Sequence, residues 1–216
     1  RCGRDMVLSL SPGPALLEKA ELYKQTSNMW RITDDFWDDW RLLYAMFERA
    51  EKWCTHAGSG HWPDADMLPI GPIRQTEGQE NRTQFTPDEQ RTMLTLWSIF
   101  RSPLIIGGDM TGFDPFTMSM ITNRQILAMH RLSRHAHQVW RREIGGTEFA
   151  LWAAACAQGG QYAAVFNLGE RADHIRIPLC DLEADDASQA ENLWAGDVIP
   201  ICDALEASVP AHGAAA

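Results

Sequence analysis

Apolar and polar positions in the first 131 residues follow two alternating patterns. Short apolar runs bounded by Pro, Gly or Asp predict buried strands, and longer segments with apolar residues three or four positions apart predict helices. The predicted strands are residues 6–10, 29–33, 61–68 and 103–107. The predicted helices are residues 15–25, 36–53, 87–101 and 123–131. Strands that alternate with helices in this way are typical of a parallel sheet covered by helices.

Two of these helices carry start signals. Thr86, Pro87 and Glu89 form a capping box with proline at the first helical position, which predicts a helix start at residue 87. For the helix predicted over residues 36–53, either Asp34 or Asp35 stands at the expected N-cap.

The pattern changes at about residue 138, where helical periodicity ends. Short β-rich runs separated by Gly-Gly and Gly-Glu turns predict a small antiparallel sandwich. The runs are residues 138–144, 148–155, 161–167 and 174–179. A boundary near residues 131–137 divides the chain into a first domain, residues 1–134, and a second domain, residues 135–216.

Four successive β/α units correspond to the C-terminal half of a (β/α)₈ barrel, in which catalytic residues lie at the C-terminal ends of the strands. The predicted fold class is therefore α/β, half a TIM barrel followed by an antiparallel β-sandwich. The chain begins without Met at Arg1 and closes on three alanines, so we expect both ends to be cut and the second domain to be truncated. Since half a barrel has an open edge, we expect the 216-residue chain alone to be inactive and poorly soluble.

Composition excludes several classes of function. With 45% hydrophobic residues the chain can form a sizeable core, and its net charge of −10 argues against nucleic acid or an anionic membrane as partner. No segment has the length of a membrane span. The five cysteines include no CxxC pair, so neither a zinc site nor a disulfide framework is expected. The nine tryptophans can stack on sugars, but core packing is the favoured interpretation.

The densest acidic segment follows the strand predicted over residues 29–33. Its carboxylates can cap a helix, or one of them can be a catalytic acid beside a cation and an aromatic ring. An adjacent arginine lowers the pKa of a carboxyl group and apolar walls raise it, so such surroundings can tune an acid. The spacing alone leaves both interpretations open. The acidic residues are Asp34, Asp35, Asp38 and Asp39, and the neighbours assigned to substrate binding are Arg31 and Trp30.

Two further clusters carry polar chemistry. Asp64 and Asp66 are two positions apart on a predicted strand, so their side chains are expected to point the same way and to bind sugar hydroxyls or a metal. Hydroxyl binding is favoured, because a metal usually recruits more ligands and no HxH or HExxH motif is present. Asp109 follows Gly107 and Gly108 at a strand end, where a tight turn is the favoured interpretation.

Three ordered motifs resemble glycoside hydrolase family 27, the family of α-galactosidases (melibiases) and α-N-acetylgalactosaminidases. The resemblance covers residues 5–131. For the β domain it rests only on the domain's position in the chain and its β-rich pattern. The motifs are WRITDDFWDDW at residues 30–40, WPDADMLPIG at 62–71 and LWSIFRSPLIIGGD at 96–109.

This resemblance implies a retaining double displacement by two carboxyl groups about 5–5.5 Å apart. Asp35 matches the family's acid/base, with Asp34 as the alternative, and Arg31 matches the arginine that binds the sugar beside it. Asp66 and Met67 match the floor of the galactose pocket, with Asp64 as their neighbour. The family's nucleophile is expected upstream of Arg1, so this chain lacks it.

One departure from the family concerns specificity. Where α-galactosidases carry Cys-Glu-Trp after the first strand, this chain has Ser11, Pro12 and Gly13. Ser11 is similar to the residue in N-acetylgalactosaminidases, which need room for an acetamido group, but Pro12 and Gly13 fit neither class. Terminal α-galactosides are the expected substrates, with α-N-acetylgalactosaminides or β-L-arabinopyranosides as the same-family alternatives.

Two other functions stay open on the sequence. One is a non-catalytic carbohydrate-binding relative that keeps the cleft, and the other is a metal-dependent barrel hydrolase that uses Asp64 and Asp66. Under the favoured interpretation we expect a carbohydrate substrate, no cofactor and no resident metal, and no nucleic acid or membrane partner. The resemblance implies a secreted or periplasmic protein, and the oligomeric state is open.

Overall fold

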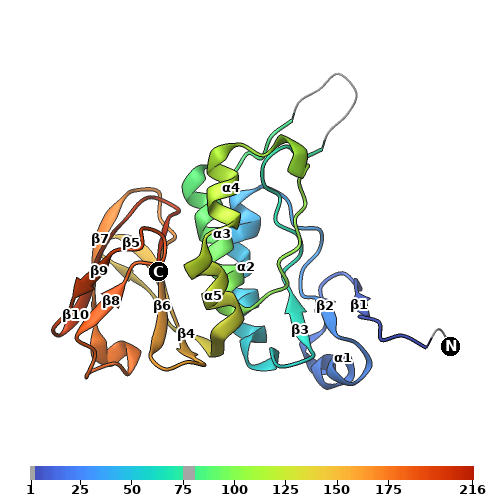
Figure 1. Ribbon diagram of the computed structural model, residues 1–216, viewed down its shortest axis with the longest axis horizontal. Helices are drawn as coiled ribbons and strands as arrows, with labels where there is room; N and C mark the ends of the chain where they lie inside the picture. The colour runs from blue at the N-terminus through green and yellow to red at the C-terminus, as the bar shows by residue number, and fades with distance from the viewer. Residues whose placement is uncertain (1–2, 75–80) are drawn as a thin grey trace.

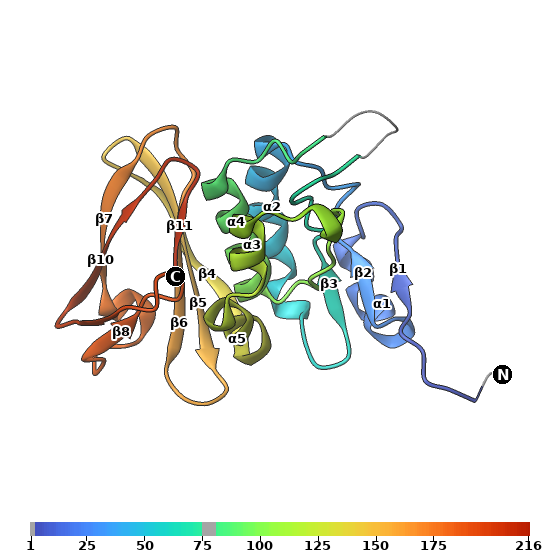
Figure 2. The same cartoon turned by 45° about the horizontal axis from the view of Figure 1, so that its top comes forward.

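The computed structural model describes residues 3–74 and 81–216 and consists of two domains side by side (Figure 1). In the first domain a small parallel sheet is covered by helices. The second domain is formed by antiparallel strands, which pack against the helices on the side away from the parallel sheet (Figure 2). The predicted fold class is confirmed.

The parallel sheet has the order β1-β2-β3. Trp30 of β2 pairs with Leu10 on one side and with Pro63 on the other, and a further parallel bridge joins Leu68 to Ile106. The bridge places the segment predicted as the fourth strand beside the segment that follows β3. The strands are β1 (Ser9–Leu10), β2 (Met29–Arg31) and β3 (Trp62–Asp64).

All four strands are shorter than predicted. Met6 and Val7 are exposed, because β1 has a neighbouring strand only at β2 among the described residues. The segment 103–107 forms one bridge rather than a strand, and just after it a Cβ atom on Gly108 would lie 2.0 Å from the carbonyl oxygen of Ile70. This close approach of two backbones, rather than a tight turn, requires glycine there.

The second helix also differs from the prediction. It begins at Trp40 instead of residue 36, and its N-cap is Asp39, whose side chain accepts the Arg41 amide at 2.9 Å. Asp34 and Asp35, the predicted caps, lie in the irregular segment before it. This leaves their carboxylates available for other contacts. The helices of the first half are η1 (Leu17–Lys19), α1 (Ala20–Thr26), α2 (Trp40–Trp53) and η2 (Cys54–His56).

The predicted capping box is confirmed at the start of α3 (Pro87–Phe100). Thr86 accepts the Glu89 amide at 3.2 Å, and Glu89 accepts the Thr86 amide at 2.8 Å. Buried residues occupy every face of α3 beyond its first turn, which is typical of a helix packed on both sides. The elements that follow are η3 (Met110–Gly112), α4 (Pro115–Ile121) and α5 (Arg124–Leu132).

Helix α4 was missed by the periodicity argument, because it spans only two turns. Its start signals were present in the sequence: Asp114 accepts the Thr117 amide at 2.8 Å, and Pro115 holds the first helical position. Helix α5 ends at Leu132 and β4 begins at Ser133, next to the proposed limit between residues 134 and 135. That limit stays a prediction.

The second domain contains a four-stranded sheet of order β11-β6-β5-β4, the pair β10-β7 and the pair β8-β9, all antiparallel. Strand β5 is buried on both faces: Trp152 belongs to the core shared with the helices, and Leu151 to the core inside the sandwich. The elements are β4 (Ser133–Ile144), β5 (Thr147–Cys156), β6 (Gln161–Asn167), β7 (Asp173–Pro178), η4 (Leu179–Leu182), β8 (Gln189–Glu191), β9 (Val198–Pro200), β10 (Ala204–Val209) and β11 (Ala214–Ala215).

Polar contacts join the two domains at the start of α3. The second carboxylate oxygen of Glu89 lies 2.8 Å from Nδ1 of His212, and Thr92 donates to the His212 carbonyl at 2.6 Å. The His212 ring stacks on Trp40 with 3.7 Å between centroids. Glu89 therefore serves the capping box and the domain interface together.

The described part of the chain holds no helix both long and apolar enough to span a membrane. Its cysteines, Cys54, Cys156, Cys180 and Cys202, are unbridged, and Cys2 lies outside the described residues.

Candidate active site

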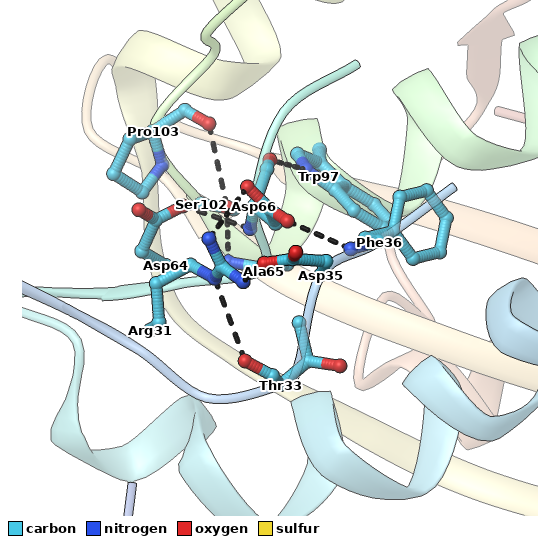
Figure 3. Close-up of polar contacts among 10 residues, drawn as sticks. All are labelled: Arg31, Thr33, Asp35, Phe36, Asp64, Ala65, Asp66, Trp97, Ser102 and Pro103. Carbon is cyan, nitrogen blue, oxygen red and sulfur yellow. Dashed lines mark hydrogen bonds and ion pairs between the residues drawn. The ribbon is translucent and has the colours of Figure 1, made fainter. Parts of the chain in front are cut away.

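Polar side chains gather where β2 and β3 end. Arg31 is the last residue of β2 and Asp64 the last of β3, and the two are register partners in the parallel sheet. Because neighbouring parallel strands end at the same edge, the segments that follow them carry Asp35 and Asp66 to one place (Figure 3).

Arg31 joins the two carboxylates. Its Nη2 lies 2.8 Å from Oδ1 of Asp35, and its Nη1 lies 3.2 Å from Oδ1 of Asp66. The side chains of Arg31 and Asp66 are each only 14% exposed, whereas that of Asp35 is 82% exposed. The site therefore has a depth order, with Arg31 and Asp66 inside and Asp35 at the rim.

Asp66 is held in an unusual backbone conformation. Its φ is 78°, a left-handed value that aspartate adopts more readily than most residues. Its amide donates to Oδ1 of Asp64 at 2.9 Å, and its Oδ2 accepts the Phe36 amide at 2.7 Å. These contacts fix the direction of the carboxylate. Since the strand ends at Asp64, the argument that alternate strand residues point the same way fails here.

Two residues that the sequence reasoning missed support this segment from below. Trp97 of α3 donates its indole N–H to the carbonyl of Asp66 at 3.0 Å, and its ring contacts Phe36 with 5.0 Å between centroids. Ser102 accepts the amide of Ala65 at 2.9 Å. Both lie in the third motif, but a buried Trp and a Ser carry no pattern that distinguishes such a role from ordinary packing.

Asp64 lies beneath the rest of the site. It is buried, and this burial raises the pKa of its carboxyl group; the Asp66 carboxylate also raises it, while the Asp66 amide and Arg31 act in the opposite direction. The structure thus places Asp64 as a support for the Asp66 backbone, and its predicted contact with substrate stays a prediction.

The raised pKa makes Asp64→Asn informative. The folded state holds the proton more tightly than the unfolded chain, whose pKa is near 3.8, so ionisation of Asp64 opposes folding. This destabilisation of the folded state is absent below pH 3.8. It increases as the pH rises through the folded-state pKa and reaches its maximum above that pKa. In urea titrations of the whole protein at pH 4 to 7, we measure the free energy of unfolding of Asp64→Asn minus that of the wild type. This difference should become more positive as the pH rises. Asn keeps an oxygen for the Asp66 amide.

Asp34→Asn, which also replaces one aspartate by asparagine but at an exposed position, is measured beside it as the control for loss of one carboxyl group. Parallel curves for the wild type and Asp64→Asn would contradict the assignment.

The structure does not support a substrate contact for Trp30. The residue is fully buried on β2, and its ring packs between Tyr23 and Trp53 with centroid distances of 5.8 and 5.9 Å. Adjacent residues of a strand point to opposite faces, so Trp30 faces the helices while Arg31 faces the site.

The remaining predicted residues lie around the edge of the site. Ser11 is exposed in the loop after β1, and in that loop a Cβ on Gly13 would lie 3.5 Å from Oδ1 of Asp34. Met67 is half-buried, and its sulfur packs against Gly107. A Cβ atom added to Gly107 would lie only 2.4 Å from this sulfur. Ser11 and Met67 thus follow the first and third strands, on either side of Arg31.

Residues 3–74 and 81–216 contain no group of three or more His, Cys, Asp or Glu side chains that could hold a metal ion. Asp109, the third acidic candidate, is exposed and accepts the Thr111 amide at 2.9 Å as the cap of η3. What the site offers chemically is an exposed carboxyl group, an arginine and an inner carboxylate in fixed positions.

Comparison with known proteins gives consistent matches over both domains. The family described as "Alpha galactosidase A" (Melibiase_2) matches residues 2–131, and the "Alpha galactosidase C-terminal beta sandwich domain" (Melibiase_C) matches residues 146–216. Alpha-galactosidase D of Emericella nidulans is 27% identical over 190 residues, which are 88% of this chain and 28% of that protein.

Solved structures agree. The chain is 45% identical to a GH27 β-L-arabinopyranosidase from Geobacillus stearothermophilus, with a TM-score of 0.92 over all of this chain and 50% of the other. It is 39% identical to a candidate α-N-acetylgalactosaminidase from Bacillus halodurans C-125, with a TM-score of 0.80 over 99% of this chain and 49% of the other. The chain thus spans about half of these structures and just over a quarter of its first curated relatives.

Proposed function

Because the chain belongs to the melibiase family, glycoside hydrolase family 27, we propose that the protein of which it is part is a retaining glycoside hydrolase that removes terminal α-galactosyl-type residues. The resemblance read from the three motifs is confirmed at the level of the family. The observation that carries the proposal is the bridge of Arg31 between the rim carboxyl of Asp35 and the inner carboxylate of Asp66.

In this proposal Asp35 is the acid/base. It donates a proton to the glycosidic oxygen as the bond to the sugar breaks, and later takes a proton from the water that releases the sugar. Arg31 stabilises the carboxylate left after the first transfer. Asp35 suits this role better than Asp34, because only Asp35 contacts Arg31. The nucleophilic carboxylate is proposed to come from a segment that precedes Arg1 in the longer protein.

Arg31, Asp66 and Met67 are proposed to bind the sugar from below, and Ser11 to lie beside its 2-position. Two related sugars fit this site. β-L-Arabinopyranose has the ring hydroxyl arrangement of α-D-galactopyranose but lacks the hydroxymethyl group at C5. The 45% identity to a β-L-arabinopyranosidase makes β-L-arabinopyranosides the second candidate substrate.

The test is an assay of the whole protein on three p-nitrophenyl glycosides: the α-galactoside, the β-L-arabinopyranoside and the α-N-acetylgalactosaminide. Cleavage of any one, with NMR showing that the first sugar released keeps its anomeric configuration, supports the proposal, and the preferred glycoside identifies the substrate. Inversion overturns the retaining mechanism. Binding of the free sugars without any cleavage would identify a carbohydrate-binding relative instead.

A further inference from the structure

An exposed indole follows the proposed acid/base closely in the chain. Trp37 is 39% exposed and stands two residues after Asp35, in the irregular segment between β2 and α2. Its neighbours on either side, Phe36 and Asp38, are both buried. Phe36 and Asp38 therefore turn inward while Trp37 turns outward.

The backbone that carries Trp37 is anchored before and after it. The Phe36 amide donates to Asp66 at 2.7 Å, and the Trp37 carbonyl accepts the Asp39 amide at 2.9 Å. The first of these contacts ties Trp37 to the candidate site itself, since Asp66 is the inner carboxylate. The backbone on both sides of the indole is thus held in place.

The ring is also supported by a cation. The guanidinium carbon of Arg74 lies 5.1 Å from the Trp37 ring centroid, within the range of a cation–π contact. Arg74 is itself held by Asp38 through two bonds of 2.6 and 3.0 Å, and the side chain of Asp38 is only 1% exposed. Asp38 also accepts the Gln84 amide at 2.5 Å. A buried carboxylate therefore orients the arginine that packs on the ring.

The depth order of the site indicates which part of a substrate this ring would meet. The acid/base must reach the glycosidic oxygen, which joins the sugar to its leaving group. Asp35 lies at the rim and Arg31 and Asp66 lie inside, so the sugar to be removed occupies the inner part and the leaving group extends outward past Asp35. Trp37 is exposed and only two residues from Asp35 in the chain, so its ring is available to the part of the substrate that extends past Asp35.

We propose that Trp37, supported by Arg74 and Asp38, is the stacking surface for the leaving group of the substrate, a sugar ring or an aromatic ring. This rests on the proposed glycosidase function. Indole rings offer a flat apolar surface that is ordered at little entropic cost, which suits them to such contacts.

The experiment compares Trp37→Ala with the wild type in the whole protein. Its probes are the p-nitrophenyl glycoside that the wild type prefers and the corresponding free sugar, D-galactose, L-arabinose or N-acetyl-D-galactosamine, as a competitive inhibitor. For Trp37→Ala we expect kcat/KM to fall about tenfold, equivalent to about 1.4 kcal/mol, with the inhibition constant of the free sugar unchanged within twofold. Trp37→Phe, which keeps a ring, should lose less.

Trp62→Ala is the matched control. Arg101 packs on the Trp62 ring at 4.3 Å, but Trp62 begins β3 at the end of the strand opposite to the site. Its removal should leave kcat/KM and the inhibition constant unchanged. Equal weakening of the free sugar by Trp37→Ala, or an unchanged kcat/KM, overturns the proposal while the glycosidase function stands. Absence of cleavage by the wild type overturns both.

Discussion

Replacing Asp35 by Asn in the whole protein should lower kcat by a factor of about 100 to 10 000, the usual contribution of general acid–base catalysis. Asn has the shape of Asp but supplies no proton. The Asp35 side chain is 82% exposed and, among the described residues, is bonded to Arg31 alone, so the folded state should not be destabilised. Steady-state kinetics and a thermal melt of the same preparation measure the two effects.

Two comparisons make this result specific. Asp34→Asn is the matched control, because Asp34 is also exposed but lacks the contact with Arg31. The loss in Asp35→Asn should also be smaller for a glycoside with a more acidic phenol, since a good leaving group needs less protonation. A large loss in Asp34→Asn with near-normal turnover in Asp35→Asn would move the acid/base to Asp34.

Arg31→Met should have the second largest effect and should lower both stability and activity. The change leaves the partly buried Asp66 with the Phe36 amide but without its cation. Removing one partner of a fully buried ion pair costs about 3 kcal/mol, so a smaller loss of stability is expected for this partly exposed pair. We expect kcat/KM to fall about a hundredfold, equivalent to about 2.7 kcal/mol. Urea unfolding and steady-state kinetics of the whole protein provide the measurements.

A double variant separates the two losses. In Arg31→Met with Asp66→Asn, the inner group is neutral and an oxygen remains for the Phe36 amide, so part of the lost stability should return. Activity should not return, because the arginine that orients Asp35 is still absent and the proposed sugar-binding carboxylate of Asp66 has also been replaced. Recovery of both properties together would mean that Arg31 acts only by stabilising the fold.

The sequence predicted what depends on neighbours in the chain. The capping box at Thr86 and Glu89 is local, and both of its hydrogen bonds are present in the structure. The helix α2 begins four residues later than the sequence predicts, because distant partners hold the chain before Trp40 in an irregular conformation. Phe36 is bonded to Asp66, and Asp38 to a residue 36 positions away. No local pattern reports such contacts.

The same distinction applies to the candidate site. Arg31 and Asp35 are four positions apart and could be associated from spacing, and their contact is present at 2.8 Å. The contact between Arg31 and Asp66 depends on the register of β2 with β3. This register cannot be read from the sequence. Trp30 shows the converse error: aromatic character suggested a sugar contact, but its strand position turned it into the core.

The burial of α3 on every side limits how this architecture can be rearranged. One part of the helix holds the loop of Asp66 through Trp97, and another receives the second domain through Thr92 and Glu89. If the β domain were exchanged for an unrelated one, helix α3 would lose apolar and polar partners. This helix positions the inner carboxylate of Asp66. We therefore expect that the β domain cannot be exchanged independently of the domain that carries the site.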